Sequence, residues 1–442
     1  MVSRLTIFIH PHAGHGIENM QKFLFSLYNA GWRAARPLLQ LNPRLKDGYA
    51  ARTLHLAPPG PVDIWIQAAS AGEAYLAETL IKALPGGRPL DILVSTNTRQ
   101  GMDILKKTMT VISGERPEYH IRATYFPFDQ PALMDTAVQQ IDPQLMVLLE
   151  TELWPGLLSA LHKYGRKILI INARMTPKSL KRYQLLPDLW RTLGPYKVLA
   201  ISRADADRFA SLFGRGIVDV MPNIKFDRVH LDDALNEKST ELSHLLPSEA
   251  DFLVLGSVRQ EEEADVTQMI DRLNSRLPGL VIGIFPRHMH RLSAWQQCLE
   301  KMKKPWTCRS SITTKSVKPG TIILWDTFGE LNAAYARATA VFVGGSLAPL
   351  GGQNFLEPLI HGLVPVIGPS WENFAWVGEK VFNMGLVKKT RNWETAAKEL
   401  IQLIEHPPPR DQIRAAAADY VKRRQGGSEQ ASRLIMRTLS DY

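Results

Sequence analysis

Short apolar runs alternate with longer amphipathic segments from residue 62 onward. A short apolar run bounded by turn residues is typical of a buried strand, and apolar residues at helical spacing indicate a helix that covers a sheet. In the first half, strands are expected at 62–69, 91–96, 123–128, 145–150, 167–173, 197–202 and 218–222. In the second half, they are expected at 252–257, 280–286, 321–326, 339–345 and 365–369. This alternation predicts an α/β fold with doubly wound, parallel sheets.

Two Rossmann-like domains are expected, because 442 residues exceed what one hydrophobic core usually serves. The N-terminal domain is expected at 53–228 and the C-terminal domain at 229–442. The polar stretch 229–250 resembles a linker, and a last helix near 428–440 is expected to pack back onto the first domain. Residues 1–19 are interpreted as a possible extension.

Residues 20–52 carry six Lys or Arg and one Asp, and 20–36 has the apolar face of a helix that Pro37 ends or kinks. Arg33 and Arg36 interrupt the apolar run, so it makes a poor transmembrane span. A basic amphipathic helix suits the surface of an anionic membrane. Packing on the body of the protein is the alternative, and the pattern leaves both open.

The composition excludes several classes of protein. With 45% hydrophobic and 22% charged residues the chain is globular, and two cysteines do not make a disulfide framework or a zinc site. The net charge of +10 favours an anionic partner: nucleic acid, membrane phosphates or a nucleotide. No P-loop, dinucleotide fingerprint, metal motif or nucleic-acid module occurs, so a nucleic-acid partner is not favoured.

Ser70-Ala71-Gly72-Glu73 directly follows the first strand. The spacing S-x-x-E is that of a capping box, in which Ser70 and Glu73 bond each other's backbone. The alternative is a general base, since a carboxylate at a helix N-terminus is expected to stay ionised. On this motif alone the cap is favoured.

Glu150 and Glu152 follow another strand, in the motif ETELWP. On an extended segment they face the same side, where they would orient a polar ligand. Alternatively, one of them caps the helix that begins at Pro155. Lys225 would stabilise a developing phosphate charge, or else pair with Asp227 at the surface.

Three motifs end strands of the second half. Arg287, after Pro286, suits bidentate contact with a phosphate. The backbone of 326–331 would border a base or ribose. In GGSLAPLGGQNFLEPLIHG (344–362), the glycines are expected to let the backbone approach a ligand, Asn354 to open a helix that favours an anion, and Glu357 to accept bonds from ribose.

Taken in order, the motifs resemble those of 3-deoxy-D-manno-octulosonic acid (Kdo) transferases over about residues 20–425. The motifs are AASAGE, TNTRQG, YFPFD, LLETELWP, NARM, NIKFD, PRH, DTFGEL, GGSLAPLGGQNFLEP and GPSWENF. The resemblance implies a GT-B fold, in which two Rossmann-like domains face each other across a cleft. It also implies inverting transfer of Kdo from CMP-Kdo to a lipid A precursor, without a metal or other cofactor.

The resemblance implies a role for each matching residue. Glu73 would be the general base, and Glu150, Glu152 and Lys225 would stabilise the transition state. CMP would be held by Pro286, Arg287, Phe328, Gly329, Glu330, Asn354, Phe355, Leu356 and Glu357. The chain departs from the family pattern at Pro222, Arg259 and Gln353, where the family usually has Gly, His and His.

The implied setting is the cytoplasmic face of a bacterial inner membrane, with the protein peripheral or anchored by its N-terminal region. The expected partners are a CMP-sugar, a lipid A precursor and an anionic membrane surface, with no nucleic acid. Two rival functions stay open. One is a GT-B transferase or epimerase that uses a UDP-sugar, and the other is a non-catalytic protein of this fold that binds an anionic lipid.

Overall fold

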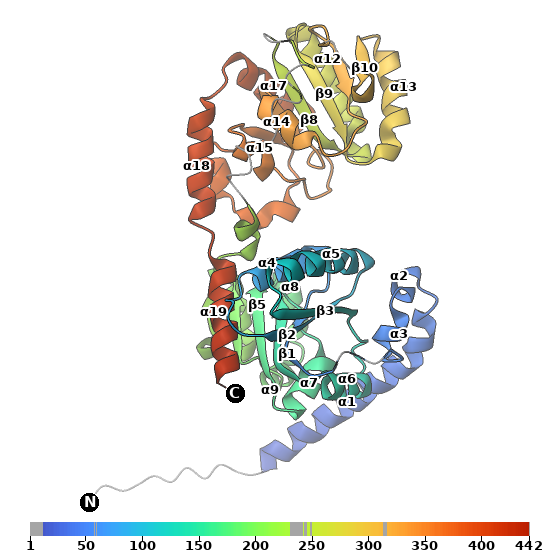
Figure 1. The fold of residues 1–442 in the computed structure, drawn as a ribbon, viewed down its shortest axis with the longest axis vertical. Helices are drawn as coiled ribbons and strands as arrows, with labels where there is room; N and C mark the ends of the chain where they lie inside the picture. The colour runs from blue at the N-terminus through green and yellow to red at the C-terminus, as the bar shows by residue number, and fades with distance from the viewer. Residues whose placement is uncertain are drawn as a thin grey trace, which may run out of the picture. The chain divides into compact units, whose positions relative to one another are not determined.

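The computed structural model describes residues 12–56, 58, 60–229, 242, 245–247, 250–312 and 316–441. It divides into two compact units, of which the first comprises Met1–Arg228 and Arg424–Tyr442, and the second Val229–Arg423 (Figure 1). Most of the expected linker at 229–250, and residues 1–11 of the expected extension, lie outside the described residues.

A parallel sheet of seven described strands, in the order β3-β2-β1-β4-β5-β6-β7, forms the centre of the first unit. The strands are β1 (Val62–Gln67), β2 (Leu90–Thr96), β3 (Tyr119–Tyr125), β4 (Pro143–Leu149), β5 (Lys167–Ala173), β6 (Lys197–Ala200) and β7 (Val218–Val220). The helices are α1 (His12–Leu39), α2 (Pro43–Lys46), α3 (Tyr49–Arg52), α4 (Ala71–Lys82), α5 (Arg99–Glu115), α6 (Pro131–Ile141), α7 (Pro155–Lys163), α8 (Pro177–Tyr183), α9 (Pro187–Thr192), α10 (Arg203–Phe213), η1 (Arg215–Ile217), η2 (Ile224–Arg228) and α19 (Gly427–Ser440).

Alternation along β1 explains why both faces of this sheet are covered by helices. Ile64 and Ile66 belong to a core cluster that includes Leu76 of α4 and Ile435 of α19. Trp65, between them, belongs to the cluster on the opposite face, which includes Leu157 of α7. Successive strand residues point to opposite faces, so a strand that is apolar throughout must be buried on both.

The last helix, α19, belongs to the first unit, although it follows the second unit in sequence. Asp227 accepts hydrogen bonds from the backbone N–H groups of Gly426, at 2.7 Å, and Ser428, at 2.6 Å. Ser432 Oγ donates to Ala83 O at 2.9 Å. The segment from Arg424 onward, which the sequence pattern placed in the C-terminal domain, is therefore bound into the first unit at its helix N-terminus.

The second unit has a parallel sheet of seven described strands in the order β10-β11-β9-β8-β12-β13-β14. The strands are β8 (Phe252–Val258), β9 (Val281–Pro286), β10 (Trp306–Cys308), β11 (Ile322–Leu324), β12 (Ala340–Val343), β13 (Pro365–Ile367) and β14 (Lys388–Lys389). The helices are η3 (Gln260–Glu262), α12 (Glu263–Arg276), η4 (Met289–Arg291), α13 (Leu292–Met302), η5 (Arg309–Ser311), α14 (Leu331–Arg337), α15 (Leu356–Ile360), η6 (Glu372–Val377), α16 (Lys380–Asn383), α17 (Trp393–Glu405) and α18 (Arg410–Lys422).

The structure corrects several expected elements. β10 and β14 were not predicted, because edge strands of two or three residues carry too little pattern. β3 begins at Tyr119, four residues before its predicted start at residue 123, and it ends at Tyr125. Pro37 does not end α1, which continues to Leu39. So close to the C-terminus of a helix, proline removes a single bond of the last turn.

α1 is attached to the body of the first unit by polar and aromatic contacts. Tyr28 donates its hydroxyl to Asp129 Oδ2 at 3.0 Å, and Arg36 donates to Gln130 Oε1 at 3.2 Å. The rings of Trp32 and Phe128 lie 5.7 Å apart. The packing alternative for this helix is therefore confirmed, and membrane binding stays a prediction. Among the helices of the described residues, none is long and apolar enough to cross a membrane.

Asp129 also caps a helix from outside it. Its carboxylate accepts from the backbone N–H groups of Gly156 at 2.9 Å and Leu157 at 2.7 Å, in the first turn of α7. The side chain is 1% exposed. Burial raises its pKa to about 7, although these hydrogen bonds and that from Tyr28 act in the opposite direction. One buried carboxylate thus joins α1 to the N-terminus of α7.

We predict that Asp129→Ala lowers the free energy of unfolding by about 3 kcal/mol, because three buried or half-buried donors lose their acceptor. Asp135→Ala, which removes an exposed ion pair between α6 and Lys163, should cost less than about 1 kcal/mol. Urea unfolding of both variants measures the difference, and equal midpoints would show that Asp129 is not a structural anchor.

Candidate active site

Three carboxylates meet at the ends of two neighbouring strands of the first unit. Glu73 lies in α4, which follows β1, while Glu150 and Glu152 follow β4. β1 and β4 pair in the middle of the sheet, and the chain leaves them in opposite directions, to β2 on one side and to β5 on the other. Ligands of doubly wound sheets bind at such a switch point, beyond the carboxyl ends of the strands.

Glu73 forms the predicted capping box. Its Oε2 accepts from Ser70 N at 2.8 Å, and its backbone N–H donates to Ser70 Oγ at 3.4 Å. Within the part of the chain that the structure describes, Ser70 is the only residue that donates to this carboxylate, through its backbone N–H and its side chain. The cap therefore does not exclude the base, because no other residue competes with a ligand for the carboxylate.

The expectation that the helix N-terminus keeps Glu73 ionised is wrong near neutral pH. The side chain is 8% exposed. Burial raises its pKa to about 7, and the nearby charges of Glu152 and Glu150 act in the same direction. The two hydrogen bonds from Ser70 lower the pKa but do not compensate. This pKa lies in the range where a general base works best at neutral pH.

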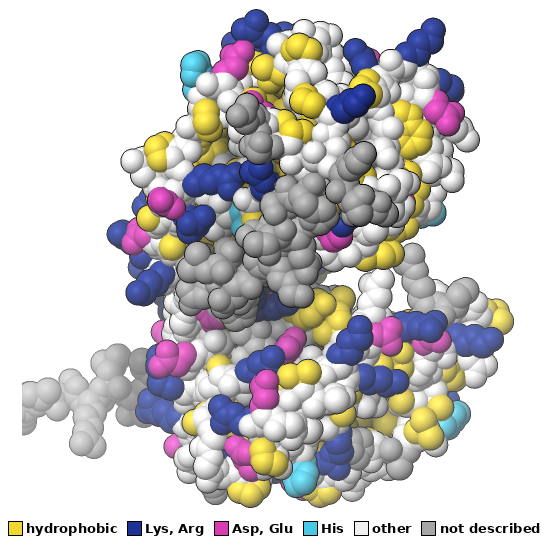
Figure 2. Space-filling model, turned by 45° about the horizontal axis from the view of Figure 1, so that its top comes forward, with side chains coloured by type: hydrophobic (Ala, Val, Ile, Leu, Met, Phe, Trp, Pro, Cys, Tyr) yellow, Lys and Arg dark blue, Asp and Glu magenta, His cyan; other side chains and the backbone are white. Residues whose placement is uncertain are grey.

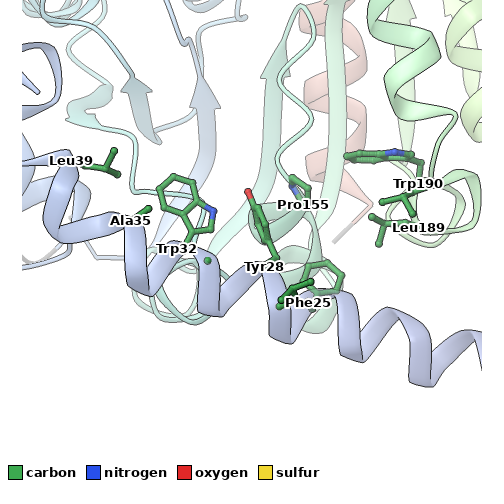
Figure 3. A pocket seen from close by; sticks show the side chains of 11 residues that line it. Phe25, Tyr28, Trp32, Ala35, Leu39, Pro155, Leu189 and Trp190 are labelled. Atoms are coloured by element: carbon green, nitrogen blue, oxygen red, sulfur yellow. The ribbon is translucent and has the colours of Figure 1, made fainter.

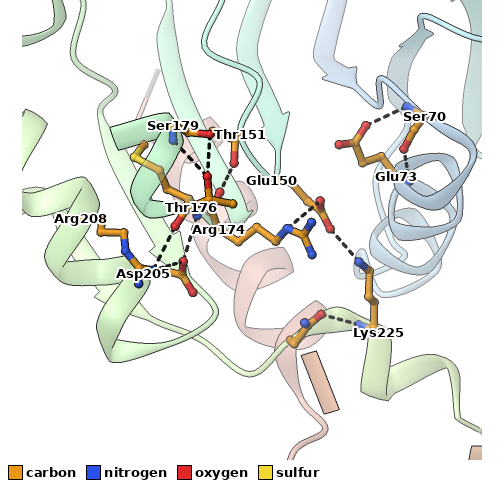
Figure 4. A network of polar contacts seen from close by, with 12 residues as sticks. Ser70, Glu73, Glu150, Thr151, Arg174, Thr176, Ser179, Asp205, Arg208 and Lys225 are labelled. Carbon is orange, nitrogen blue, oxygen red and sulfur yellow. Dashed lines mark hydrogen bonds and ion pairs between the residues drawn. The ribbon is translucent and has the colours of Figure 1, made fainter. Parts of the chain in front are cut away.

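Glu150 is held by two cations. Lys225 Nζ lies 2.9 Å from Glu150 Oε1, and Arg174 Nε lies 3.5 Å from Oε2 (Figure 4). Glu150 has φ +55°, so it begins a turn and not the extended segment expected for the two glutamates. The expected alternative pairing of Lys225 with Asp227 is also wrong, since Asp227 caps α19.

Glu152 has partners of its own. It accepts from the indole N–H of Trp154 at 2.7 Å and from the buried side chain of Gln67, at the end of β1. Burial raises its pKa above the usual range of a glutamate. Neither glutamate caps α7, because Asp129 does so. Of the two alternatives for Glu150 and Glu152, the prediction that they orient a polar ligand therefore remains.

Two buried or nearly buried asparagines place Lys225 beside Glu150. Asn172 Oδ1 accepts from Ile224 N at 2.9 Å, and Asn223 Oδ1 accepts from Lys225 N at 3.0 Å. Both bonds fix η2, the short helix that carries Lys225. In the sequence, these asparagines and Arg174 stood out only as parts of motifs, and Gln67 was not predicted. A polar residue at the end of an apolar strand was the available signal for Gln67.

In the second unit, Glu262 anchors the glycine-rich loop. Its carboxylate, 1% exposed, accepts from the backbone N–H groups of Gly345, Ser346, Leu347 and Arg259. Burial raises its pKa, against the effect of these bonds. The bonds tie the end of β8 to the end of β12, which is the switch point of the second sheet.

The glycines of this loop serve the protein's own packing, and their expected role in letting the backbone approach a ligand stays a prediction. A Cβ on Gly344 would lie 2.5 Å from Glu262 Oε1, and one on Gly351 would collide with Asn373. Gly351 and Gly352 also have φ of +84° and +76°, which other residues rarely adopt. The loop has little freedom to change, whatever it binds.

The expected nucleotide contacts after this loop differ in exposure. Asn354 donates to Glu357 Oε1 at 2.8 Å and accepts from Leu356 N at 3.1 Å. The helix α15 begins at Leu356, two residues later than expected, and has five residues. Phe355 and Leu356 are 1% and 4% exposed, so their side chains belong to the core and only their backbone groups can face a ligand.

Arg287 and Phe328 present exposed side chains. Arg287 follows Pro286 at the end of β9, and Phe328 is 83% exposed, next to Gly329 with φ +84°. Glu330 is different, because its carboxylate already accepts from Arg309 (two bonds of 2.9 Å), Trp325 and Thr327. Glu330 therefore shapes this loop and has little capacity left for a ligand.

The charge of the molecule is not gathered into one patch on the face drawn in Figure 2. There, Lys and Arg side chains are spread over both units, with Asp and Glu among them. Within the described ranges, no group of three or more His, Cys, Asp or Glu side chains has an arrangement that could hold a metal ion.

Comparisons with known proteins match both halves of the chain. Residues 36–228 match the sequence model of "3-Deoxy-D-manno-octulosonic-acid transferase (kdotransferase)". The 3-deoxy-D-manno-octulosonic acid transferases of Haemophilus influenzae and Bordetella pertussis are each 27% identical to the chain. These matches cover 89% and 87% of this chain and 90% and 89% of the relatives. The expected resemblance to Kdo transferases is confirmed.

Another relative is longer than this chain. The "Bifunctional glycosyltransferase/methyltransferase" of Fusobacterium nucleatum is 28% identical over 79% of this chain, which spans about half (53%) of that protein. Among solved structures, a UDP-GlcNAc 2-epimerase from Neisseria meningitidis has a TM-score of 0.53 at 13% identity, with 86% of this chain and 100% of that chain covered. A glycosyltransferase from Rickettsia africae also has a TM-score of 0.53, at 10% identity, with coverages of 87% and 99%. The expected GT-B fold, of two α/β domains with parallel sheets, is confirmed.

We predict that Glu73→Gln stabilises the protein above pH 7. The pKa of Glu73 is about 7 in the folded state, whereas it is 4.5 for a glutamate that the fold does not surround. Stability is therefore lost as the pH rises from 4.5 to 7, and the glutamine avoids this loss while its amide oxygen still accepts from Ser70 N. The expected gain is on the order of 1–3 kcal/mol above pH 7 and disappears near pH 4.5.

Urea unfolding at both ends of this pH range is the measurement. Glu78→Gln, in the same helix, is the matched control; it breaks an ion pair with Lys82 and should change stability by less than about 0.5 kcal/mol. A gain for Glu73→Gln that did not depend on pH would contradict the raised pKa.

Proposed function

Because the chain resembles Kdo transferases in its motifs and in its curated relatives, we propose that it is a glycosyltransferase that moves Kdo from CMP-Kdo to a lipid A precursor. The observation that carries this proposal is the carboxylate cluster at the switch point of the first sheet. Glu73, which the resemblance implies as general base, has there a pKa raised to about 7, and Ser70 is the only donor to its carboxylate among the described residues.

The proposed reaction is a direct displacement with inversion. Ionised Glu73 accepts the proton of an acceptor hydroxyl, whose oxygen attacks the anomeric carbon C2 of Kdo. The bond from C2 to the phosphate oxygen breaks, and CMP leaves with the electron pair. Protonated Glu73 then returns its proton to water. The carboxylates Glu150 and Glu152 lie near enough to influence the pKa of Glu73, so they belong to the same site.

Lys225 and Arg174 place positive charge in this site. Each contacts one oxygen of Glu150, and their side chains are 23% and 46% exposed. Two cations facing one carboxylate leave positive charge available to stabilise negative charge that develops on the reactants. Lys225 therefore has the geometry of a transition-state stabiliser that Glu150 orients.

The second unit is proposed to bind the donor. Arg287, exposed at the end of β9, would contact the phosphate of CMP, with Pro286 beside it. The backbone of Phe328 and Gly329 and the Asn354–Glu357 pair would border the nucleoside. Phe355 and Leu356 contribute through backbone groups and packing, and Glu330 by holding the loop.

The proposed location is the cytoplasmic face of a bacterial inner membrane. The basic region at 20–52 supports it, since positive charge near an amphipathic helix attracts anionic lipid. No metal or other cofactor is needed in the proposed step, and nucleic acid has no part in it.

We predict that purified protein adds the mass of Kdo to a tetraacylated lipid A precursor when CMP-Kdo is supplied, and that it releases CMP. Glu73→Gln should lower the rate by about 10²–10⁴, because the base is lost while the cap is kept. Transfer by wild type should rise with pH through about 7, as Glu73 ionises. Glu152→Gln should shift this limb to lower pH, since it removes a neighbouring negative charge.

Mass spectrometry of the lipid and a CMP assay follow this reaction. Glu78→Gln, in the same helix as Glu73 but in a surface ion pair, is the control and should transfer like wild type. Full transfer by Glu73→Gln would remove the base assignment. No transfer by folded wild type would contradict the donor or the acceptor.

We also predict that Arg287→Ala raises the KM for CMP-Kdo about tenfold or more, with a smaller effect on kcat, because a charged hydrogen bond to phosphate is lost. CMP should compete with the donor better than UMP. Stronger competition by UMP than by CMP would instead favour the rival transferase or epimerase that uses a UDP-sugar.

A further inference from the structure

An apolar groove runs beneath α1 in the first unit. Its volume is about 710 Å³, and side chains of α1 line one side while Pro155 of α7 and Leu189 and Trp190 of α9 line the other. Figure 3 shows Tyr28 pointing from α1 toward Pro155, with Trp32 next to it along the helix. A volume of this size lies within the range of sites that hold small molecules.

The groove offers almost no polar group to an occupant. The polar groups of its lining side chains are the hydroxyl of Tyr28, which is already bonded to Asp129 at 3.0 Å, and the indole N–H groups of Trp32 and Trp190. An occupant with hydrogen-bonding groups would lose its bonds to water without replacement, which is costly. The chemistry of the groove therefore selects a hydrocarbon.

Exposed apolar side chains line the groove or neighbour its lining residues in sequence on both walls. Leu27 and Leu38 on α1 are 61% and 67% exposed, and Leu185 and Leu186, before α9, are 79% and 43% exposed. Leu27 and Leu186 also line the groove. Apolar side chains that gather at an opening in this way mark a lipid or interaction site. The region 20–52 adds six Lys or Arg against one Asp, which complements phosphates.

We propose that this groove holds an acyl chain of the lipid acceptor. The proposal rests on the proposed function, and it gives the acceptor a second attachment apart from its reacting sugar. The groove contributes binding energy by burying the hydrophobic acyl chain. The exposed basic side chains Arg33 and Lys46 attract the phosphates of the same lipid.

The groove and the carboxylate cluster share the N-terminus of α7. Pro155 lines the groove and follows Trp154, whose indole N–H bonds Glu152. Asp129 accepts from Tyr28 in the groove wall and from Gly156 and Leu157 in α7. A lipid with its chain in the groove would thus contact the helix that directly follows the segment Glu152–Trp154.

Gly31 allows the groove to be filled without disturbing another contact. It lines the groove, and a Cβ added to it would meet no atom within 4 Å. Gly31→Leu therefore inserts a side chain into the groove. Gly114→Leu is the matched control, because Gly114 is also helical, in α5, exposed, and open around its Cβ. Both changes replace glycine within a helix, which favours folding.

The first arm measures which acceptor the enzyme prefers. Transfer from CMP-Kdo is followed with the tetraacylated precursor and with the same phosphorylated disaccharide after removal of its acyl chains. Wild type and Gly114→Leu should prefer the acylated acceptor. Gly31→Leu should lower the ratio of the two kcat/KM values by about tenfold, or about 1.4 kcal/mol. An unchanged ratio would overturn the proposal.

The second arm needs no turnover. Stearic acid with a nitroxide on its chain, used below its micelle-forming concentration, should quench tryptophan fluorescence, since Trp32 and Trp190 line the groove. Quenching of wild type and Gly114→Leu, but not of Gly31→Leu, supports the acyl site even if wild type transfers no Kdo. Equal quenching of all three overturns it.

Size-exclusion chromatography tests the remaining alternative, in which a second copy of this protein occupies the groove. A concentration-dependent dimer that Gly31→Leu abolishes, without a difference in lipid quenching, would assign the groove to that copy and overturn the proposal. A failed transfer reaction with groove-dependent quenching would contradict the proposed function and leave the acyl site standing.

Discussion

The cost of burying carboxylates side by side, from desolvation first and mutual repulsion second, is the constraint on which the first unit depends. Glu73, Glu150 and Glu152 are brought together by the pairing of β1 with β4, and two of them are strongly shielded from water. The protein meets this cost in different ways for each. Glu150 forms ion pairs with Lys225 and Arg174. Glu152 accepts hydrogen bonds from an indole and an amide. Glu73 is only partly compensated by its hydrogen bonds, so its pKa is raised. The group left with the least compensation is the one suited to exchange a proton at neutral pH.

Much of the remaining structure serves to hold these partners in place. Lys225 reaches Glu150 because Asn172 and Asn223 fix η2, and η2 is fixed in turn by Asp227, which caps α19. α19 comes from the end of the chain, so the cluster is completed only when the last segment returns to the first unit. The stability of the site and the closure of the fold are therefore one property.

Buried carboxylates also organise both units away from the cluster. Asp129 joins α1 to α7, and Glu262 joins the end of β8 to the loop after β12. Each accepts several N–H groups, which is how an acidic side chain becomes tolerable inside a protein. The two anchors stand beside the groove of the first unit and the glycine-rich loop of the second, so they hold the walls of the proposed lipid and donor sites.

The sequence by itself determined the alternating elements, the two parallel sheets and the motifs that end their strands, because burial patterns, caps and turn residues act over a few neighbouring positions. It also predicted the capping box of Ser70 and Glu73. Only the tertiary structure decided that Glu73 titrates near neutral pH, that Lys225 pairs with Glu150 across 75 positions, and that the loop glycines make room for Glu262 and Asn373. The groove beneath α1 was equally out of reach of the pattern. These properties arise from burial and from partners distant in sequence, and a local pattern contains no information about either.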